Sequence, residues 1–404
     1  MLTQEDIPGF FASRSEIEPK DYVVLHYLFE TAGDPRLAAA TLCSEQSTAQ
    51  WNRPGRDEDF RSRHGAKVVD LKDCRGGPAC PPSRHHHVEI AHPHRNFGPR
   101  IPNFLSAAAG EGPFYCPGIE TIRWTDFEFP KDFLREFEGP QFGMEGLRES
   151  LNIHGRPFFI GVVKPNIGLP PVEFADIAYR GWVGGLDIAK DDEMLADADG
   201  SPLSERAVLA GRARLKAEKE TGQKKIFIAN ITDEVDRIGD LHDAAVAGGA
   251  NCVMINAIMT GLSALRVLRR RAKVPVMSHF TGTACFSRIP DFGISSLVTT
   301  KIQRLAGADI IGLAGFGERM RCTDTEVLEN IDACLKPWGP IRAALPVPGG
   351  SETAKTLPEV FGKIGHSDFG FICGRGVFGH PQGPEAGARG LINAWASIRQ
   401  DERE

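Results

Sequence analysis

The chain has 404 residues, of which 41% are hydrophobic and 25% charged, and its formal net charge is -6. This length favours two domains, and the composition is that of an ordinary globular protein. The negative charge argues against a surface for nucleic acid or an anionic membrane, and no apolar run approaches the roughly 20 residues that span a bilayer. The acidic start lacks the apolar core of a secretory signal, and nine scattered cysteines favour reduced thiols. We therefore expect a cytoplasmic protein without nucleic-acid or membrane partners.

Residues 1–140 predict a small domain in which strands and helices follow one another irregularly. Runs with the alternating or β-branched texture of strands occupy residues 22–29, 65–71, 86–91 and 121–129. Helical patterns occupy residues 34–48 and 101–109. This order predicts a small α+β sheet domain.

Three consecutive histidines, His85, His86 and His87, lie within this domain and invite a metal-site interpretation. Adjacent side chains on a strand point to opposite faces, so only His85 and His87 could share a metal ion. Because the triplet lies away from the other polar clusters, we interpret it as an exposed polar strand or loop.

From about residue 155 the pattern becomes a regular alternation of strand and helix. Apolar runs typical of buried parallel strands occupy residues 158–163, 185–189, 225–231, 252–257, 275–280, 309–313, 341–347 and 369–373. Helical patterns follow them at residues 171–182, 204–221, 234–248, 261–271, 294–306, 324–335, 357–364 and 384–399. These units predict a TIM barrel over residues 141–404. An open, doubly wound sheet is the competing architecture, but no glycine-rich dinucleotide fingerprint follows the first strand.

One short apolar run, residues 184–189, leads directly into Lys190, Asp191, Asp192 and Glu193. On a buried strand Lys190 and Asp192 point to the same side because they are two residues apart, and Glu193 begins the following loop. Two carboxylates suit a hard cation such as Mg²⁺. An ammonium cannot bind Mg²⁺, but a lysine that has reacted with CO₂ to form a carbamate supplies a third anionic ligand. A solvated charge run is the alternative interpretation of these residues taken alone.

In a TIM barrel the chemistry is expected at the C-terminal ends of the strands. The polar residues at those positions are Lys164, Asn166, Lys190, Asp192, Glu193, Asn230, Thr232, Asn256, Ser278 and His279. The loops after strands seven and eight, which commonly bind phosphate, contain Gly349-Gly350 and Gly374-Arg375-Gly376. Glycine lets backbone N–H groups approach an anion closely, so the two loops favour a phosphate site, although a tight turn explains either one alone.

Four long motifs resemble those of the RuBisCO large subunit, and more closely those of the RuBisCO-like proteins. They occupy residues 45–51, 161–169, 184–193 and 379–388, in the order found in that family. The resemblance implies a ferredoxin-like N-terminal domain followed by a TIM barrel. It also implies a homodimer, or a multiple of dimers, in which each active site combines one barrel with the partner's N-terminal domain.

The resemblance further implies roles for individual residues. Lys190 would carry the carbamate, with Asp192 and Glu193 as the other Mg²⁺ ligands. Lys164 would be the acid/base, and His279 would contact the substrate. The residues implied to bind substrate or phosphate are Asn166, Gly349, Gly350, Gly374 and Arg375, and those implied to reach the partner's site are Glu45, Gln50, Trp51 and Glu111.

The chain also departs from the carboxylases at several of these positions. Asn166 replaces a second lysine, and Phe280 stands where carboxylases carry an arginine that grips a phosphate. The sixth strand, residues 309–312, lacks two histidines, and the loop at residues 313–319 lacks the lysine that polarises CO₂. Glu111 stands at the position of an amide that contacts the CO₂-derived group. We therefore expect no net CO₂ fixation.

The remaining groups still suit stabilisation of an enediolate. The favoured reaction is decarboxylation of a phosphorylated 3-oxo sugar acid, since loss of CO₂ from a β-keto acid gives an enediolate directly. The resemblance points to 3-oxo-isoapionate 4-phosphate in carbohydrate-acid catabolism. The alternative is enolisation or isomerisation of a methylthio-pentulose phosphate, as in methionine salvage, with Phe280 and Ile310 lining an apolar pocket. A non-catalytic binding protein is a third hypothesis, but an unused cluster of like charges is costly.

Overall fold

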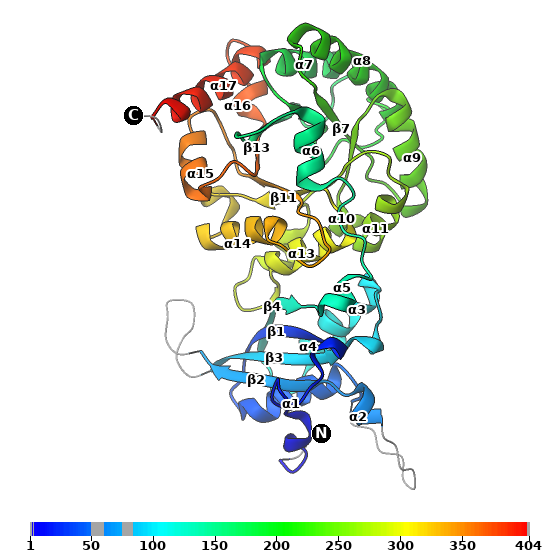
Figure 1. The fold of residues 1–404 in the computed structure, drawn as a ribbon, viewed down its shortest axis with the longest axis vertical. Helices are drawn as coiled ribbons and strands as arrows, with labels where there is room; N and C mark the ends of the chain where they lie inside the picture. Colours follow the sequence, from blue (N-terminus) through cyan, green and yellow to red (C-terminus); the bar gives the residue numbers. More distant parts are fainter. Residues whose placement is uncertain (1, 3, 50–59, 75–83, 402–404) are drawn as a thin grey trace. The chain divides into compact units, whose positions relative to one another are not determined.

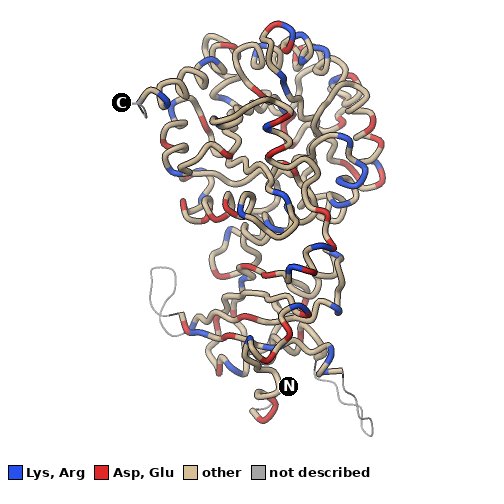
Figure 2. Tube along the Cα trace, in the orientation of Figure 1, with Lys and Arg blue, Asp and Glu red and all other residues tan. Residues whose placement is uncertain are grey.

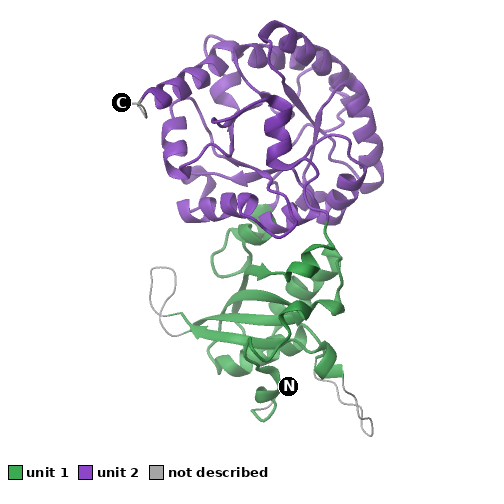
Figure 3. Cartoon of the chain, viewed as in Figure 1, with its two compact units in different colours: residues 1–137, 283–299 green, residues 138–282, 300–404 purple. Residues whose placement is uncertain are grey.

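The computed structural model describes residue 2 and residues 4–49, 60–74 and 84–401 (Figure 1). The chain divides into two compact units (Figure 3). Unit 1 contains Met1–Phe137 and Thr283–Thr299, and unit 2 contains Glu138–Gly282 and Thr300–Glu404. Residues 283–299 thus join unit 1, although residues 141–404 were expected to form the barrel domain.

Unit 1 is built on a sheet with the strand order β10-β4-β1-β3-β2. The strands are β1 (Tyr22–Glu30), β2 (Lys67–Asp73), β3 (His85–Pro93), β4 (Thr121–Glu128) and β10 (Gly293–Ile294). β1 pairs antiparallel with β3 and β4, β2 pairs antiparallel with β3, and β10 pairs parallel with β4. Helix α1 (Pro35–Glu45) connects β1 to β2, and α3 (Ile101–Ala109) lies between β3 and β4. This order is the ferredoxin-like topology that the family resemblance implied.

The core of unit 1 follows from the alternation of side chains along its strands. Leu25, Tyr27 and Phe29 of β1 are at most 1% exposed. Phe104 of α3 meets the rings of Trp124 and Phe127 on β4 edge-on, at 5.5 Å and 5.2 Å. The shorter helices of unit 1 are η1 (Ile7–Phe10), η2 (Pro19–Asp21), α2 (Phe60–His64), η3 (His94–Asn96), α4 (Glu111–Tyr115), α5 (Lys131–Leu134) and α12 (Thr283–Ser287).

The histidine triplet lies on β3, and the interpretation as an exposed strand is wrong for two of its members. His85 and His86 are 6% and 5% exposed. The Nδ1 atom of His86 lies 2.9 Å from Asp73 Oδ1, and its ring packs 5.4 Å from that of Phe29. His86 therefore belongs to the packed interior of unit 1.

Unit 2 contains eight parallel strands in the order β12-β11-β9-β8-β7-β6-β5-β13. They are β5 (Phe158–Val162), β6 (Ile188–Lys190), β7 (Ile226–Asn230), β8 (Cys252–Ile255), β9 (Val276–Ser278), β11 (Ile310–Ala314), β12 (Leu345–Gly349) and β13 (Gly370–Cys373). β12 and β13 stand at the two ends of this strand order. They nevertheless lie side by side, since a Cβ at Gly370 on β13 would lie 2.9 Å from Val347 Cγ2 on β12. The predicted eight-stranded barrel is thereby confirmed.

Helices follow the barrel strands as the sequence pattern predicts. The long ones are α7 (Pro171–Gly184), α8 (Leu203–Thr221), α9 (Val235–Gly248), α11 (Leu262–Arg271), α13 (Ser296–Ala306), α14 (Asp324–Leu335), α15 (Leu357–Ile364) and α17 (Pro384–Asp401). Short helices interrupt the loops at α10 (Ala257–Thr260), η4 (Glu318–Met320) and α16 (Arg375–Phe378).

Strand β12 begins four residues later than the expected start at residue 341, because backbone groups before it have other partners. The N–H of Ile341 bonds to Trp338 O, and Ala343 O accepts from Met144 N. The N–H of Ala344 donates to Cys334 O. The shift places Gly349 within the strand end rather than in the following loop.

A helix that the pattern did not predict, α6 (Gly143–Leu151), closes the N-terminal end of the barrel. Its buried residues Met144, Leu147 and Leu151 pack into the same core as the inward side chains of the strands. The backbone N–H of Gly143 donates to Asp309 Oδ1, directly before β11. The opposite, C-terminal end of the strands is therefore the end available for a site.

The described residues include no helix that is both long and apolar enough to cross a membrane. Acidic and basic positions are interspersed along both units (Figure 2).

Candidate active site

Lys164 and Asp192 meet beyond the C-terminal ends of two neighbouring strands. β5 and β6 are parallel, with Val162 opposite Lys190, so the residues after each strand emerge side by side. Lys164 Nζ donates hydrogen bonds to Asp192 Oδ2 at 2.5 Å and to Asn166 Oδ1 at 3.0 Å. The Asp192 side chain is fully buried and that of Lys164 is 25% exposed. The lysine is therefore the accessible partner of a buried carboxylate.

Lys190, the last residue of β6, is fully buried. Its Nζ donates to the backbone oxygen of Asp191 at 2.6 Å. Burial lowers the pKa of Lys190 to about 8, although the carboxylates of Glu193 and Asp192 act in the opposite direction. Near pH 8 much of this amine is therefore neutral, which is its nucleophilic form.

Asp191 points away from Lys190 and Asp192, as the two-residue period of a strand requires. Its carboxylate accepts from Arg206 Nε and Nη2, both at 3.1 Å, and from the backbone N–H of Asn230 at 2.8 Å. Asp191 and Arg206 are both fully buried. The middle carboxylate of the charged run thus ties β6 to α8, which leaves Asp192 and Glu193 for the candidate site.

Two asparagines at the ends of β7 and β8 hold the loop after β6. Asn230 Nδ2 donates to the backbone oxygens of Asp192 and Glu193, both at 3.1 Å, and Asn256 Nδ2 donates to Glu193 O at 3.0 Å. Asn256 Oδ1 is buried and has no hydrogen-bond partner among the described residues. A buried acceptor of this kind is normally satisfied by a donor or an ion.

His279 follows β9 and lies beside Glu193. Its Nε2 is 3.8 Å from Glu193 Oε2, and its Nδ1 is 2.6 Å from the hydroxyl of Thr281. Burial lowers the pKa of His279 well below its usual value, and the positive charges of Lys190 and Lys164 lower it further. The imidazole is therefore neutral at physiological pH, and it contacts a ligand as a hydrogen-bonding group rather than as a cation.

Phe280 stacks on His279 with ring centroids 4.6 Å apart. Glycine at position 312 makes room for this ring, since a Cβ there would lie 3.3 Å from Phe280 Cδ1. Ile310, which was expected to share an apolar pocket with Phe280, packs instead in the core of the barrel. That expectation is wrong because Ile310 begins β11, far from the strand's C-terminal end.

The two glycine-rich loops follow the adjacent strands β12 and β13. Gly349 ends β12, and Gly374 follows β13. A Cβ at Gly374 would lie only 3.0 Å from Lys164 Cε, so glycine lets the lysine chain pass this loop. Arg375 begins α16 and is exposed. Gly374 and Lys164 are thus brought together, while the guanidinium of Arg375 has no described partner at the site.

Three further residues lie near these loops and belong to none of the motifs described above. Arg319, in the sixth loop, donates from Nη1 to Ser351 Oγ at 2.6 Å. Ser351 has a φ of 72°, which is uncommon for a residue other than glycine and often marks functional loops. Glu352 is 6% exposed and burial raises its pKa, and its Oε1 lies 3.4 Å from where Gly350 would carry a Cβ. Their only sequence signal was their place beside the glycine pair or in the sixth loop.

Asp192 and Glu193 are the carboxylates that could hold a metal ion at this site. Within the described residues, no group of three or more His, Cys, Asp or Glu side chains could hold a metal alone. A carbamate on Lys190 would add a third anionic group to this pair. A set of three anionic ligands for a metal ion at this site therefore requires a carbamate on Lys190.

The residues implied to reach a partner's site lie in unit 1. Glu45 ends α1 and Glu111 begins α4, and both are exposed. They lie close together, because a Cβ at Gly112 would be 3.4 Å from the backbone oxygen of Glu45. Gln50 and Trp51 lie outside the described residues.

Models of two protein families match the chain. The N-terminal domain of the ribulose bisphosphate carboxylase large chain matches residues 11–133. The catalytic domain of the same large chain matches residues 143–404. The two matches together account for nearly the whole sequence, in the order found in the fold.

Individual relatives agree with these matches. A ribulose bisphosphate carboxylase-like protein of Chlorobaculum tepidum is 54% identical over 414 residues, covering 99% of this chain and 94% of the relative. The solved structure of an octameric ribulose-1,5-bisphosphate carboxylase/oxygenase from Pyrococcus horikoshii, a complex with sulfate, is 31% identical with a TM-score of 0.90, covering 98% of this chain and 92% of that one. A dimeric archaeal RuBisCO from Hyperthermus butylicus is 29% identical with a TM-score of 0.88, covering 98% and 94%.

Proposed function

The chain belongs to the ribulose bisphosphate carboxylase large-chain family, and we propose that it is a Mg²⁺-dependent, RuBisCO-like enzyme that forms an enediolate without fixing CO₂. The proposed substrate is a phosphorylated 3-oxo sugar acid, such as 3-oxo-isoapionate 4-phosphate in carbohydrate-acid catabolism, and the proposed reaction is its decarboxylation. The observation that carries the proposal is the bond from Lys164 to the buried Asp192, beside the buried amine of Lys190.

The side chains fit a Mg²⁺ ion together with a carbamate on Lys190. Asp192 and Glu193 supply carboxylates, and Asn256 Oδ1 is a buried oxygen without a described partner. These are the oxygen donors that Mg²⁺ prefers. The lowered pKa of Lys190, about 8, favours its reaction with CO₂. When bound, the ion would stabilise negative charge on substrate oxygens.

Lys164 is the proposed acid/base. Its bonds to Asp192 and Asn166 fix the amine, and its partial exposure lets it exchange protons with water. In decarboxylation the bond between the substrate carbon and its carboxylate breaks, CO₂ leaves, and the electron pair stays on the substrate as an enediolate. Lys164 then donates a proton to that carbon. The neutral imidazole of His279 is proposed to hydrogen-bond a substrate oxygen from the side of Glu193.

The phosphate end of the substrate is assigned to the loops after β12 and β13. Gly349, Gly350 and Gly374 offer backbone N–H groups without side chains that would block an anion. Arg319 of the sixth loop is bonded to Ser351, directly after this glycine pair. We assign it a phosphate contact, which no family motif had indicated.

Phe280 supports the proposal that the substrate is not the bisphosphate of the carboxylases. Its ring stacks on His279 and packs against Gly312, and by the family resemblance it stands where carboxylases carry a phosphate-gripping arginine. An aromatic ring cannot neutralise a second phosphate. The substrate is therefore proposed to carry one phosphate rather than two.

The same ring favours the second candidate, enolisation or isomerisation of a methylthio-pentulose phosphate. A thioether end would pack against Phe280 more readily than a sugar hydroxyl, since sulfur makes favourable contacts with aromatic rings. A non-catalytic role remains the third hypothesis, and the test below separates it from both reactions.

The proposed assembly is a homodimer or a multiple of dimers in the cytoplasm. The Hyperthermus protein is dimeric and the Pyrococcus protein is octameric. Glu45 and Glu111, exposed and close together on unit 1, are the described residues proposed to reach the partner's site.

The test is a ¹H and ³¹P NMR screen of the enzyme with Mg²⁺ and bicarbonate. The two substrates are 3-oxo-isoapionate 4-phosphate and a methylthio-ribulose phosphate. Release of CO₂ from the first, dependent on Mg²⁺ and bicarbonate and lost in Lys190→Ala, is the expected result. Deuterium exchange or isomerisation of the second alone would favour the alternative. If neither substrate reacts and Lys190→Ala binds both as the wild type does, the site is not catalytic.

A further inference from the structure

The side chain of His279 is held on several sides, which fixes the direction of its two ring nitrogens. The backbone N–H of His279 donates to Ile255 O at 3.0 Å, at the end of β8. The ring of Phe280 stacks on that of His279, with centroids 4.6 Å apart and an interplanar angle of 24°. Thr281 lies at Nδ1, and Nε2 is 3.8 Å from Glu193 Oε2. Nδ1 therefore faces the loop after β9, and Nε2 faces the candidate active site.

Thr281 makes two contacts with Nδ1 of His279, and the direction of one of them cannot be reversed. The backbone N–H of Thr281 donates to Nδ1 at 3.2 Å. The hydroxyl oxygen of Thr281 lies 2.6 Å from the same nitrogen and can either donate or accept. A backbone N–H is only a donor, and a ring nitrogen accepts only when it carries no proton. Nδ1 is therefore unprotonated, the hydroxyl is its second donor, and the single ring proton lies on Nε2.

Nε2 is the ring nitrogen that remains for a ligand. It has no hydrogen-bond partner among the described residues, because 3.8 Å from Glu193 is too long for a hydrogen bond, and the side chain of His279 is 9% exposed. An N–H group at this place can donate to a carbonyl, enolate or carboxylate oxygen of a ligand. The ring cannot remove a proton from a ligand, because its only lone pair, on Nδ1, already accepts from Thr281.

We propose that Thr281 is a positioning residue that holds the proton of His279 on Nε2, so that the ring donates a hydrogen bond to the keto oxygen of the substrate and does not act as a base. In the decarboxylation, the electron pair of the broken carbon–carbon bond forms the enediolate and places negative charge on this oxygen. The Nε2–H group stabilises that charge and keeps its proton, while Lys164 supplies the proton that ends on carbon. The keto oxygen belongs to the proposed substrate, so its identity rests on the proposed function, whereas the position of the ring proton does not.

The first test reads the position of the proton and needs no substrate. ¹⁵N NMR of the full-length assembly, labelled at histidine, distinguishes a protonated ring nitrogen from an unprotonated one, and the signals of His279 are those that disappear in His279→Gln. We expect an unprotonated Nδ1 and a protonated Nε2 in the wild type. Thr281→Val keeps the backbone N–H but loses the hydroxyl, so the Nδ1 signal should move and part of the population should carry the proton on Nδ1. Thr281→Ser should restore the wild-type spectrum.

The second test is kinetic and uses the substrate that reacts in the NMR screen described above. Thr281→Val should lower kcat about three- to tenfold, the effect of one lost neutral hydrogen bond, with little change in KM, because the donor acts on charge that develops only during the reaction. Thr281→Ser should recover the rate. His279→Gln should keep about tenfold more activity than His279→Leu, because an amide can donate in place of Nε2, whereas loss of such a donor costs about 10²–10³ in kcat.

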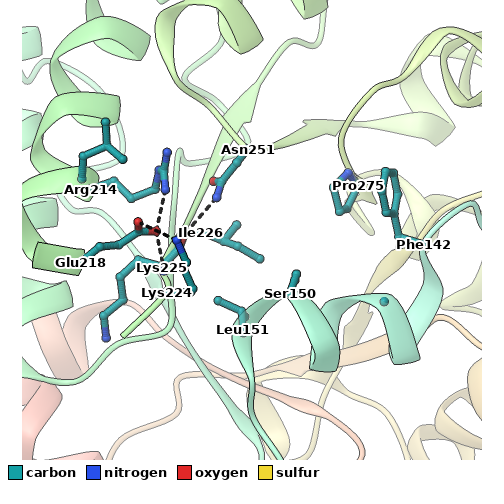
Figure 4. A pocket seen from close by; sticks show the side chains of 12 residues that line it. Phe142, Ser150, Leu151, Arg214, Glu218, Lys224, Lys225, Ile226, Asn251 and Pro275 are labelled. Atoms are coloured by element: carbon teal, nitrogen blue, oxygen red, sulfur yellow. Dashed lines mark hydrogen bonds and ion pairs between the residues drawn. The ribbon is translucent and has the colours of Figure 1, made fainter. Parts of the chain in front are cut away.

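The control lies on α8, away from the candidate active site. A cavity of about 350 Å³ opens beside α6 and α8 at the N-terminal end of the barrel, and Figure 4 shows Arg214 and Glu218 of α8 bonded to each other in its wall. Thr221, three residues after Glu218, donates its hydroxyl to Ala217 O at 2.8 Å. Thr221→Val removes this hydrogen bond at a distance from His279, so the His279 spectrum and kcat should both stay as in the wild type.

A protonated Nδ1 in the wild type would overturn the proposal, as would a Thr281→Val variant whose spectrum and kcat are both unchanged. Equal losses of activity in His279→Gln and His279→Leu would mean that the ring acts as a base. If neither substrate of the screen reacts, the proposed function fails, and the spectra of the wild type and of Thr281→Val decide the role of Thr281 alone. If Thr281→Val does not fold, the wild-type spectrum and the two His279 variants decide.

Discussion

Lys164 Nζ lies 2.5 Å from Asp192 Oδ2, so the proposed acid/base is hydrogen-bonded to a proposed metal ligand. The pair joins β5 to β6 through side chains, and it brings one positive and one negative charge together at the open end of the barrel. If Mg²⁺ binds as proposed, the lysine and the ion would share one carboxylate. A substitution of either residue should therefore change both the rate of proton transfer and the affinity for the metal ion.

Lys164→Met should lower kcat on the reacting substrate by about 10²–10⁴-fold, the usual contribution of a positioned acid or base. Mg²⁺ affinity should stay the same or rise, because no ammonium then competes for Asp192. Turnover at saturating substrate and the Mg²⁺ dependence of binding are the measurements. Lys219→Met, on the exposed part of α8, is the control. Unchanged kcat in Lys164→Met would remove the lysine from the mechanism.

Arg206→Met should destabilise the protein by about 3–5 kcal/mol, because it leaves Asp191 buried and unpaired. Guanidinium unfolding of both proteins measures this difference in free energy. Arg212→Met, exposed on the same helix, should stay within about 0.5 kcal/mol of the wild type. If the two variants unfold alike, the buried ion pair does not hold the loop that carries Asp192.

The sequence pattern predicted the barrel well because each of its strands is a short apolar run that the next helix follows. It placed α3, α14 and α15 at their observed bounds. It missed α6, although Met144, Leu147 and Leu151 have helical spacing, because this helix precedes the first strand and belongs to no strand–helix unit. It also misplaced the start of β12, since Ile341 and Ala344 bond to the preceding turn and helix end and Ala343 bonds to Met144, about 200 residues away, and an apolar pattern records none of these contacts.

At the candidate site, residues on strand ends were predictable and loop contacts were not. Because side chains alternate along a strand, the sequence predicts that Lys190 and Asp192 point to one side and Asp191 to the other. It does not reveal that Asp191 pairs with Arg206. The bond between Arg319 and Ser351 joins two loops 32 residues apart, and no periodic pattern records such a contact. The prediction that Ile310 lines the pocket was wrong because Ile310 begins β11. At that depth in the barrel its side chain packs in the core and does not reach the open end.

Phe280→Ala should distinguish the two candidate substrates. Loss of the ring should raise KM for a methylthio-pentulose phosphate by about 10–100-fold if a thioether packs on it, since an apolar contact contributes about 1–3 kcal/mol. A 3-oxo sugar-acid phosphate should be affected less. Steady-state kinetics with both substrates make the comparison. An equal change for both would mean that Phe280 supports His279 rather than selecting the substrate.

Arg319→Met should raise KM for the phosphorylated substrate about tenfold or more while kcat changes little, because a charge-assisted bond to phosphate contributes about 1.5–3 kcal/mol. Arg321→Met, two residues further along the same loop and also exposed, is the matched control. The dephosphorylated substrate provides a second comparison and should not discriminate between wild type and variant. A normal KM in Arg319→Met would assign the arginine to loop structure through Ser351.

Glu128→Gln should destabilise the protein at neutral pH, and this difference should disappear in acid. The hydrogen bond with His26, followed by the hydrogen bond and charge of Arg14, lowers the pKa of Glu128 from 4.5 to about 2. Between pH 4.5 and pH 2 the unfolded chain therefore binds a proton that the folded chain does not, so stability rises with pH across this window. The contribution is complete above pH 4.5 and is lost as the pH falls through about 2. Denaturant unfolding of wild type and variant at several pH values measures the gap, with Glu18→Gln, exposed elsewhere in unit 1, as the control. A gap that persists undiminished at pH 2 would show that the carboxylate acts through packing rather than through its charge.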